Sequence, residues 1–340
     1  MKSDINEIIQ IDSALAMPIY KQIVQSIYRS IDSGALLKDD LLPSVNKVSE
    51  EFSLARGSVF SAYNDLRAAG IIDSIPGKGY FVSSTETKQN KRIFLLFSTF
   101  TPYKETLYNA LINNLPKTCT VEIYFHHHSA KMFESLIKEQ AGYYNTFIIM
   151  PEGGTAANNT LSLLDPRQTF LLDVGFKEYN TAYAGVYQNF EEDIYSILID
   201  ARNLVQKYKR LFLVFPDGQR TKEIIAGFNK FSKTTEETTA TAVINNIKPK
   251  DIQKGDAFIV IDDNHLVEVI KVAKENKWKL GSDIGVLSYN ETSLKSVIGD
   301  GISTVTTDFA AMGKSMAKMI LSGKKEVIEN PFILIDRNSF

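Results

Sequence analysis

The sequence has little of what disulfide-bonded, zinc-binding or membrane proteins need. Its 340 residues include one cysteine, Cys119, so no disulfide can form within the chain and no thiolate zinc site can be built. The first ten residues, MKSDINEIIQ, carry charges where a signal peptide has an apolar core, and no apolar run approaches the length of a membrane span. We therefore expect a cytoplasmic protein without membrane contact.

The sequence also lacks the positive charge that is typical of nucleic-acid-binding proteins. The formal net charge is −2, and residues 1–90 carry nine Lys and Arg against eleven Asp and Glu, again a net of −2. Because phosphate neutralisation supplies most of the nonspecific affinity for DNA, a DNA-binding role requires basic residues gathered on one face. One copy should then bind weakly, and useful affinity would need a dimer.

Residues 42–82 have the pattern of a helix-turn-helix followed by a β-wing. After a short lead (residues 1–17) and a helix that begins at Pro18, one helical pattern follows Pro43 and a second runs from residue 56 to 69. Apolar strands then flank a Pro-Gly-Lys-Gly turn. A recognition helix presents its N-terminal end to DNA. The candidate DNA-binding residues are Ser44, Asn46, Lys47, Arg56, Gly57, Ser58, Ser61, Gly77 and Lys78.

Four short motifs lie within this stretch: LPS at 42–44, Arg-x-Ser-Val from residue 56, LxxxGxI from residue 66, and GKGYFV from residue 77. Together they resemble the winged-helix domain of the GntR family of bacterial transcription regulators. The resemblance implies a DNA-binding domain over residues 1–83. Asn46 and Phe60 stand where many members carry Arg, so the family's base preference does not transfer to this chain.

The rest of the chain has the pattern of an α/β protein. Residues 84–91, STETKQNK, contain no large apolar residue and form a predicted linker. Beyond it, continuous apolar runs alternate with helical patterns, which indicates strands of a parallel sheet that is covered on both faces. These runs form two sets, at 93–97, 121–125, 147–150 and 170–174 and again at 211–215, 258–262 and 284–289. Two sets predict two lobes with a ligand cleft at the carboxyl ends of the strands.

Four segments carry a second resemblance: AGF at 226–228, IGVLSYNE at 284–291, ISTVTTDFAAMGKSMAKMI at 302–320, and the closing FILIDRNSF. They are similar to the sensor domain of the LacI repressor family, which is related to periplasmic sugar-binding proteins. The resemblance implies a two-lobed, Rossmann-like ligand-sensing and dimerisation domain over residues 92–340. It places the crossovers between lobes near 180–186, 303–307 and 325–331. A GntR-type winged helix joined to such a sensor is the arrangement of arabinose repressors.

A sugar site needs polar groups that grip adjacent hydroxyls and an aromatic face for the ring. Strand-end loops and the resemblance together nominate the candidate ligand-binding residues Thr99, Phe100, Thr101, Tyr103, His126, Asp173, Tyr187, Arg220, Asp263 and Asn290. A metal at residues 126–128 is not expected, because alternate residues of a strand face opposite ways and no third ligand is near in sequence.

These patterns predict a transcription regulator that is neither an enzyme nor a cofactor-binding protein. The leading hypothesis is a homodimeric repressor of carbohydrate-utilisation genes that binds a palindromic operator and responds to a monosaccharide such as arabinose or fucose. One alternative is a pyridoxal-phosphate-dependent regulator, although no Schiff-base lysine motif stands out. A second is a transport-type binding protein, which the missing signal peptide disfavours. The ligand could also strengthen DNA binding instead of weakening it.

Overall fold

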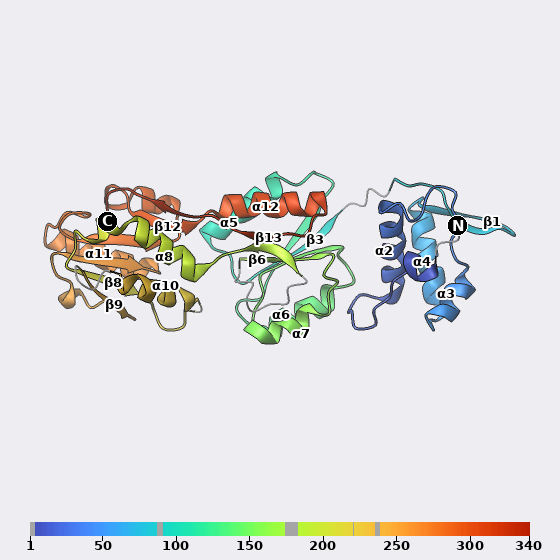
Figure 1. Ribbon diagram of the computed structural model, residues 1–340, viewed down its shortest axis with the longest axis horizontal. Helices are drawn as coiled ribbons and strands as arrows, with labels where there is room; N and C mark the ends of the chain where they lie inside the picture. Colours follow the sequence, from blue (N-terminus) through green and yellow to red (C-terminus); the bar gives the residue numbers. More distant parts are fainter. Residues whose placement is uncertain (1–3, 87–90, 174–182, 220, 235–238) are drawn as a thin grey trace. The chain divides into compact units, whose positions relative to one another are not determined.

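The structure is a computed structural model that describes residues 4–86, 91–173, 183–219, 221–234 and 239–340 (Figure 1). The chain divides into two compact units. The first contains Met1–Thr99 and Lys117–Phe170, and the second contains Phe100–Pro116 and Leu171–Phe340. The predicted linker, residues 84–91, lies partly outside the described residues.

The front of the first unit is a winged helix-turn-helix, as the sequence predicts. Its β-wing is an antiparallel hairpin in which Ile72 pairs with Val82 and Ile75 pairs with Gly79. The turn between the strands contains Gly77 at a φ of 81°, a backbone conformation that glycine adopts without strain. The elements are α1 (Ile5–Ile8), α2 (Ile19–Asp32), α3 (Val45–Glu51), α4 (Arg56–Ala68), β1 (Ile72–Ile75) and β2 (Gly79–Val82).

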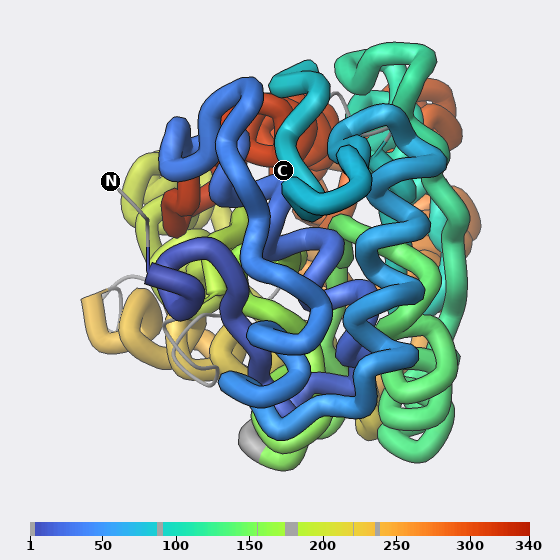
Figure 2. The backbone as a smooth tube through the Cα atoms, turned by 90° about the vertical axis from the view of Figure 1, so that its right-hand side faces the viewer, coloured from blue at the N-terminus to red at the C-terminus, as the bar shows by residue number. Residues whose placement is uncertain are grey.

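The described part of the predicted lead, residues 4–17, is an integral part of this winged domain. Ile5, Ile8 and Ile9 are buried in the same apolar core as the isoleucines of α2. The hydroxyl of Ser30 donates a hydrogen bond to the carbonyl of Ile8 at 3.0 Å. Figure 2 shows this dark-blue segment lying against the lighter-blue helices. The short lead therefore closes one side of the core of the winged domain.

One parallel sheet of six strands has the order β13-β7-β6-β5-β3-β4. In the first unit, β3 lies between β4 and β5 and pairs with both in parallel, which the continuous apolar runs predict. Each parallel strand needs a covering crossover connection, and α6 and α7 follow β4 and β5 in the chain. The elements are β3 (Arg92–Phe97), β4 (Thr120–Phe125), α6 (Ala130–Gln140), β5 (Thr146–Ile149), α7 (Ala157–Leu161), β6 (Thr169–Leu172), β7 (Ala184–Tyr187) and β13 (Val327–Glu329).

The second six-stranded sheet lies entirely in the second unit and has the order β14-β12-β11-β10-β8-β9. Its pairs are parallel except β12–β14, which is antiparallel. Its strands are β8 (Arg210–Val214), β9 (Ala240–Ile244), β10 (Asp256–Val260), β11 (Gly285–Tyr289), β12 (Ser303–Thr307) and β14 (Phe332–Ile335). The accompanying helices are α8 (Phe190–Asp200), α9 (Arg202–Val205), α10 (Glu223–Ser232) and α11 (Asp263–Glu275).

The second unit also holds a closely packed pair of helices, α5 (Pro102–Asn113) and α12 (Phe309–Ser322). Gly313 makes this packing possible, because a Cβ at that position would lie 2.5 Å from the carbonyl oxygen of Leu107. No described helix of the chain is long and apolar enough to cross a membrane.

Three short passages connect the two sheets, at residues 188–189, 308 and 330–331. The predicted ranges were 180–186, 303–307 and 325–331. The first two stop one or two residues before the passages, and the third contains its passage. Hydrogen bonds tie the passages together. The backbone N–H of Asn330 donates to the carbonyl of Tyr187 at 2.9 Å, and that of Asp308 donates to Pro331 at 2.9 Å. The passages at 308 and 330–331 are thus linked to each other and to β7 by backbone hydrogen bonds.

Candidate DNA-binding surface and ligand site

The exposed end of α4 has the geometry of a recognition helix. Val59, Tyr63 and Leu66 are fully buried and fix the rotation of the helix, so the opposite face points to solvent. The hydroxyl of Tyr63 donates to the carbonyl of Pro43 at 2.7 Å, which joins α4 to the start of α3. On this exposed end lie the predicted residues Arg56, Gly57 and Ser61, together with the half-buried Ser58.

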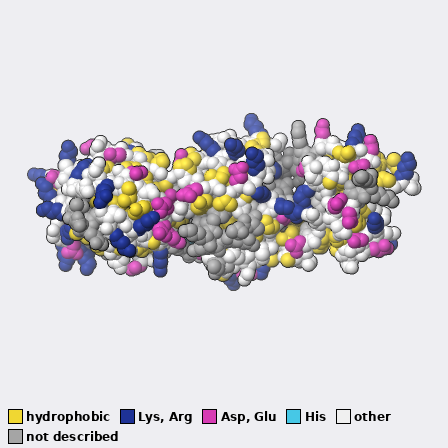
Figure 3. Space-filling model, in the orientation of Figure 1, with side chains coloured by type: hydrophobic (Ala, Val, Ile, Leu, Met, Phe, Trp, Pro, Cys, Tyr) yellow, Lys and Arg dark blue, Asp and Glu magenta, His cyan; other side chains and the backbone are white. Residues whose placement is uncertain are grey.

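The remaining predicted DNA-binding residues lie on α3 and on the wing. Ser44 caps α3 by accepting a hydrogen bond from the backbone N–H of Lys47 at 3.2 Å, so its hydroxyl already has a structural role. Asn46 and Lys47 are exposed, as are Gly77 and Lys78 at the tip of the wing. On the face drawn in Figure 3, acidic and basic side chains are interspersed over the winged domain. Any DNA-binding surface must therefore depend on where these few cations lie.

A buried polar group follows the strand ends in the second unit. Asp173, directly after β6, accepts a hydrogen bond from the amide of Gln188, and Gln188 in turn accepts one from the hydroxyl of Thr307. Burial raises the pKa of Asp173, and the charge of Lys104 and the Gln188 hydrogen bond lower it in part. Burial likewise lowers the pKa of Lys104, which is 6% exposed, and the charge of Asp173 raises it in part. The arrangement offers a carboxylate, an ammonium and an amide to a polar ligand.

Aromatic surface lies beside this group. The rings of Tyr103 and Phe309 lie 4.9 Å apart at an angle of 31°. Burial raises the pKa of Tyr103, a side-chain hydrogen bond with Thr101 lowers it in part, and the charges of Asp173 and Asp263 raise it further. The predicted residues Tyr103, Asp173 and Asp263 therefore interact electrostatically, and all three belong to the second unit.

A buried lysine organises the loop after β11. The Nζ of Lys295, a residue that is 3% exposed, donates to the carbonyls of Tyr289 and Asn290 at 3.0 and 2.8 Å. It also forms an ion pair with Asp263 at 2.9 Å. Asn290 adopts a positive φ of 63°, and its backbone N–H donates to the carbonyl of Val305 at 2.8 Å. Lys295 thereby holds the predicted residues Asp263 and Asn290 next to each other.

The histidine segment differs from the prediction of a continuing strand. β4 ends at Phe125, and His127 and His128 have positive φ values of 48° and 58°, so strand alternation does not apply to them. His126 is fully buried, with Nε2 3.2 Å from the carbonyl oxygen of Met150. His128 Nδ1 lies 3.1 Å from the carboxylate of Glu152. No group of three His, Cys, Asp or Glu that could hold a metal ion occurs within the described ranges.

The other predicted ligand residues are less closely grouped. Tyr187 donates its hydroxyl to Glu329 at 2.9 Å. Phe100 is 51% exposed, and Thr99 and Thr101 are half-buried. Arg220 lies outside the described residues. Sequence reasoning missed Lys104, Gln188, Thr307 and Lys295. Lys104 is the one that a sequence signal could have found, because it belongs to the loop 98–105 that supplied three of the candidates.

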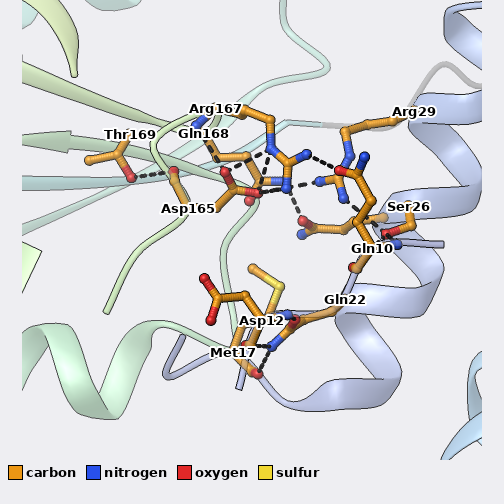
Figure 4. A network of polar contacts seen from close by, with 11 residues as sticks. Gln10, Asp12, Met17, Gln22, Ser26, Arg29, Asp165, Arg167, Gln168 and Thr169 are labelled. Atoms are coloured by element: carbon orange, nitrogen blue, oxygen red, sulfur yellow. Dashed lines mark hydrogen bonds and ion pairs between the residues drawn. The ribbon is translucent and has the colours of Figure 1, made fainter. Parts of the chain in front are cut away.

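A polar cluster that the sequence did not predict joins the winged domain to the loop before β6, and all its residues belong to the first unit (Figure 4). Asp165, 6% exposed, accepts hydrogen bonds from Nε and Nη2 of Arg167, both at 2.9 Å at their closest, and forms an ion pair with Arg29 of α2 at 3.4 Å. Arg167 also donates to Gln10 at 2.5 Å. The backbone N–H of Ala16 donates to the carbonyl of Leu163 at 2.9 Å.

Comparison with protein families assigns the two ends of the chain separately. A family described as "Bacterial regulatory proteins, gntR family" matches residues 19–82, and a "Periplasmic binding protein-like domain" matches residues 212–340. Among curated proteins, the HTH-type transcriptional repressor YtrA of Bacillus subtilis (strain 168) is 31% identical over 105 residues, which is 31% of this chain and 77% of that protein. The arabinose metabolism transcriptional repressor of Geobacillus stearothermophilus is 33% identical over 73 residues, 22% of this chain and 20% of that protein.

Solved structures resemble the larger part of the chain. A dimeric Lac repressor has a TM-score of 0.60 at 14% identity and covers 73% of this chain and 98% of its own. The trehalose repressor from Escherichia coli has a TM-score of 0.59 at 13% identity, over 73% of this chain and 100% of its own. At such identities the likeness shows the fold. It confirms the two predicted parallel-sheet lobes of the periplasmic-binding-protein type. The family match over residues 19–82 confirms the predicted winged helix-turn-helix in front of them.

Proposed function

This chain belongs to the gntR family of bacterial regulatory proteins, and from that premise we propose that it is a transcriptional repressor whose operator binding is controlled by a small sugar. The observation that carries the proposal is the joining of two modules in one chain. A winged helix with an exposed recognition helix precedes a fold of the periplasmic-binding-protein type. The first module reads DNA, and the second senses a ligand. YtrA and the trehalose repressor, both repressors by name, support this assignment.

The polar group around Asp173 is the proposed ligand site. A carboxylate, an amide and a buried ammonium suit the paired hydroxyls of a sugar, and the Tyr103 ring suits its apolar face. Asp263 and Asn290 would complete the site from the loops that follow β10 and β11. We propose a monosaccharide such as arabinose or fucose, because a GntR-type winged helix joined to such a sensor is the arrangement of arabinose repressors.

The control mechanism follows from the connections between the sheets. Asp173 follows a strand of one sheet and Asn290 a strand of the other, so a ligand that binds both favours one arrangement of the sheets. Two chains paired through these domains would carry two winged helices to a palindromic operator, with half-sites about 34 Å or a multiple apart. A difference of about 1–3 kcal/mol between the two arrangements changes operator affinity several-fold to a hundredfold.

The test uses the full chain and duplexes that it selects from a random pool. Operator affinity is measured with and without each member of a panel of free sugars. At least one sugar should change the affinity several-fold, and Asp173→Asn should remove that response while leaving the sugar-free affinity unchanged. Asp283→Asn, on a carboxylate paired with Lys254 away from the proposed site, is the matched control. If no sugar changes operator affinity or melting temperature, the sensor role is wrong.

A further inference from the structure

The outward face of α4 carries one large apolar side chain. Phe60 is 51% exposed, whereas Val59 just before it and Tyr63 three residues after it are fully buried. The exposed positions three and four residues away along the helix are Arg56, Gly57 and Asn64. The phenyl ring of Phe60 therefore stands alone on a face that is otherwise small or polar.

The ring is held at a defined place on the domain. The hydroxyl of Tyr63 donates a hydrogen bond to the carbonyl of Pro43 at 2.7 Å. The ring of Tyr63 lies edge-on to the ring of Tyr80, with 4.8 Å between the two ring centres. These contacts fix both the position and the rotation of α4, and a phenylalanine side chain has only two rotatable bonds. Beside it, a Cβ at Gly57 would meet no atom within 4 Å, so the backbone next to the ring is open to a close approach.

Exposure alone would not distinguish Phe60. Leu37 and Leu41 of the same domain are 60% and 61% exposed, and isolated exposed apolar residues are common on protein surfaces. What separates Phe60 is its place in the second turn of the helix whose N-terminal end faces the major groove in helix-turn-helix proteins. Leu37 and Leu41 lie in the connection between α2 and α3.

The chemistry of the ring limits what it can recognise. A phenyl group has no donor or acceptor, so it cannot bind the polar edge of a guanine or an adenine. The apolar group that base pairs present in the major groove is the C5-methyl of thymine, and aromatic side chains contact it. We propose that Phe60 is a specificity-determining residue that packs against a thymine methyl in each operator half-site. This rests on the proposed DNA-binding function.

The experiment removes the methyl group and the ring separately. Full-length protein selects duplexes from a random pool, and each thymine of the selected half-site is then replaced in turn by deoxyuridine, which lacks only the methyl. At one position per half-site, wild-type affinity should fall about tenfold, in line with the usual cost of a wrong base pair. Phe60→Ala should lower affinity for the thymine duplex by a similar factor and should be indifferent to deoxyuridine at that position.

Two further duplexes and a control variant sharpen the result. Replacing the T·A pair by C·G should weaken wild-type binding, and 5-methylcytosine at that position should restore part of the loss because it returns the methyl. Val297→Ala, which trims an apolar side chain that is 72% exposed in the second unit, should leave all these affinities unchanged.

The possible failures can be told apart. Wild-type indifference to deoxyuridine at every thymine overturns the assignment of Phe60 and leaves the regulator function standing. An equal deoxyuridine penalty in wild type and Phe60→Ala does the same. If the wild-type chain selects no duplex at all, the proposed function and this inference fall together.

Discussion

Replacing Asp165 by asparagine should loosen the contact between α2 and the loop that precedes β6. The carboxylate of Asp165 is the centre of the cluster in Figure 4, where it accepts three hydrogen bonds from the Arg167 guanidinium and pairs with Arg29. Asparagine keeps the size of the side chain and one acceptor oxygen. The substitution therefore removes the negative charge and leaves the packing intact.

The stability lost in Asp165→Asn depends on how exposed the two arginines are. Removing one partner of a buried ion pair costs about 3–5 kcal/mol, because the other charge stays buried and unpaired. Here the side chains of Arg29 and Arg167 are 30% and 49% exposed and border a cavity of about 200 Å³, so water can replace the lost carboxylate. Discounted for this solvation, the expected loss is about 1–2 kcal/mol.

Hydrogen exchange measured by mass spectrometry reports this loss locally. The amides of residues 10–29 and 163–169 should exchange about 5- to 30-fold faster in Asp165→Asn, since about 1.4 kcal/mol corresponds to a factor of ten. Glu134→Gln is the control, because its ion pair with Lys138 is exposed on both sides and contributes little. Wild-type exchange rates in both segments of the Asp165 variant would refute the reasoning.

The pH dependence provides a second check. Burial raises the pKa of Asp165, but hydrogen bonds from Arg167 and the charges of Arg167 and Arg29 outweigh it, so the pKa is lowered overall from 3.8. A carboxyl group with a lowered pKa in the folded state stabilises above its unfolded pKa, and that contribution is lost as pH falls through the folded value. The difference between wild type and variant should be constant at neutral pH and should shrink below about pH 4.

Three further predictions concern the second unit. Burial raises the pKa of Asp193 to about 6, so the folded state loses stability as the pH rises from about 4 to 6. Asp193→Asn should therefore raise the free energy of unfolding, measured in urea, by about 1–2 kcal/mol at pH 8 and leave it unchanged at pH 4. Lys295→Met removes a buried ammonium with three oxygen partners and should lower the free energy of unfolding by about 2–4 kcal/mol. Gly313→Ala forces a Cβ against Leu107 and should cost about 1–3 kcal/mol in thermal unfolding, whereas Gly57→Ala, at an open position, should not destabilise the chain.

The sequence predicted the elements whose signals are local. The recognition helix was expected over residues 56–69 and spans Arg56–Ala68, because its buried face repeats at helical spacing. The sheet strands with continuous apolar runs were found for the same reason. The run of Ser and Thr at 303–307 has no such signal. β12 is nevertheless fully buried, since its hydroxyls bond to neighbouring strands and passages, as when Thr307 donates to Gln188.

The candidate ligand site was predicted less completely, because its contacts join distant parts of the sequence. Thr307 and Gln188 are 119 positions apart, and no periodicity in either segment reports their meeting. The prediction for His128 was wrong in its geometry for a different reason. Strand alternation was extended past Phe125, where the backbone turns into the left-handed region.

The acidic balance of residues 1–90 is partly explained by acids that have structural roles. Asp4 caps α1, Asp40 accepts a hydrogen bond from the backbone N–H of Leu37 at 2.7 Å, and Glu51 accepts one from Asn6 at 3.3 Å. These carboxylates hold turns and helix ends, whereas the exposed ionisable residue in the first two turns of α4 is Arg56. Since only charges near the phosphates add to affinity, the net charge of the segment understates what the α4 end can bind. The shortage of cations still predicts weak binding by a single copy, so we expect the proposed repressor to bind its operator as a pair.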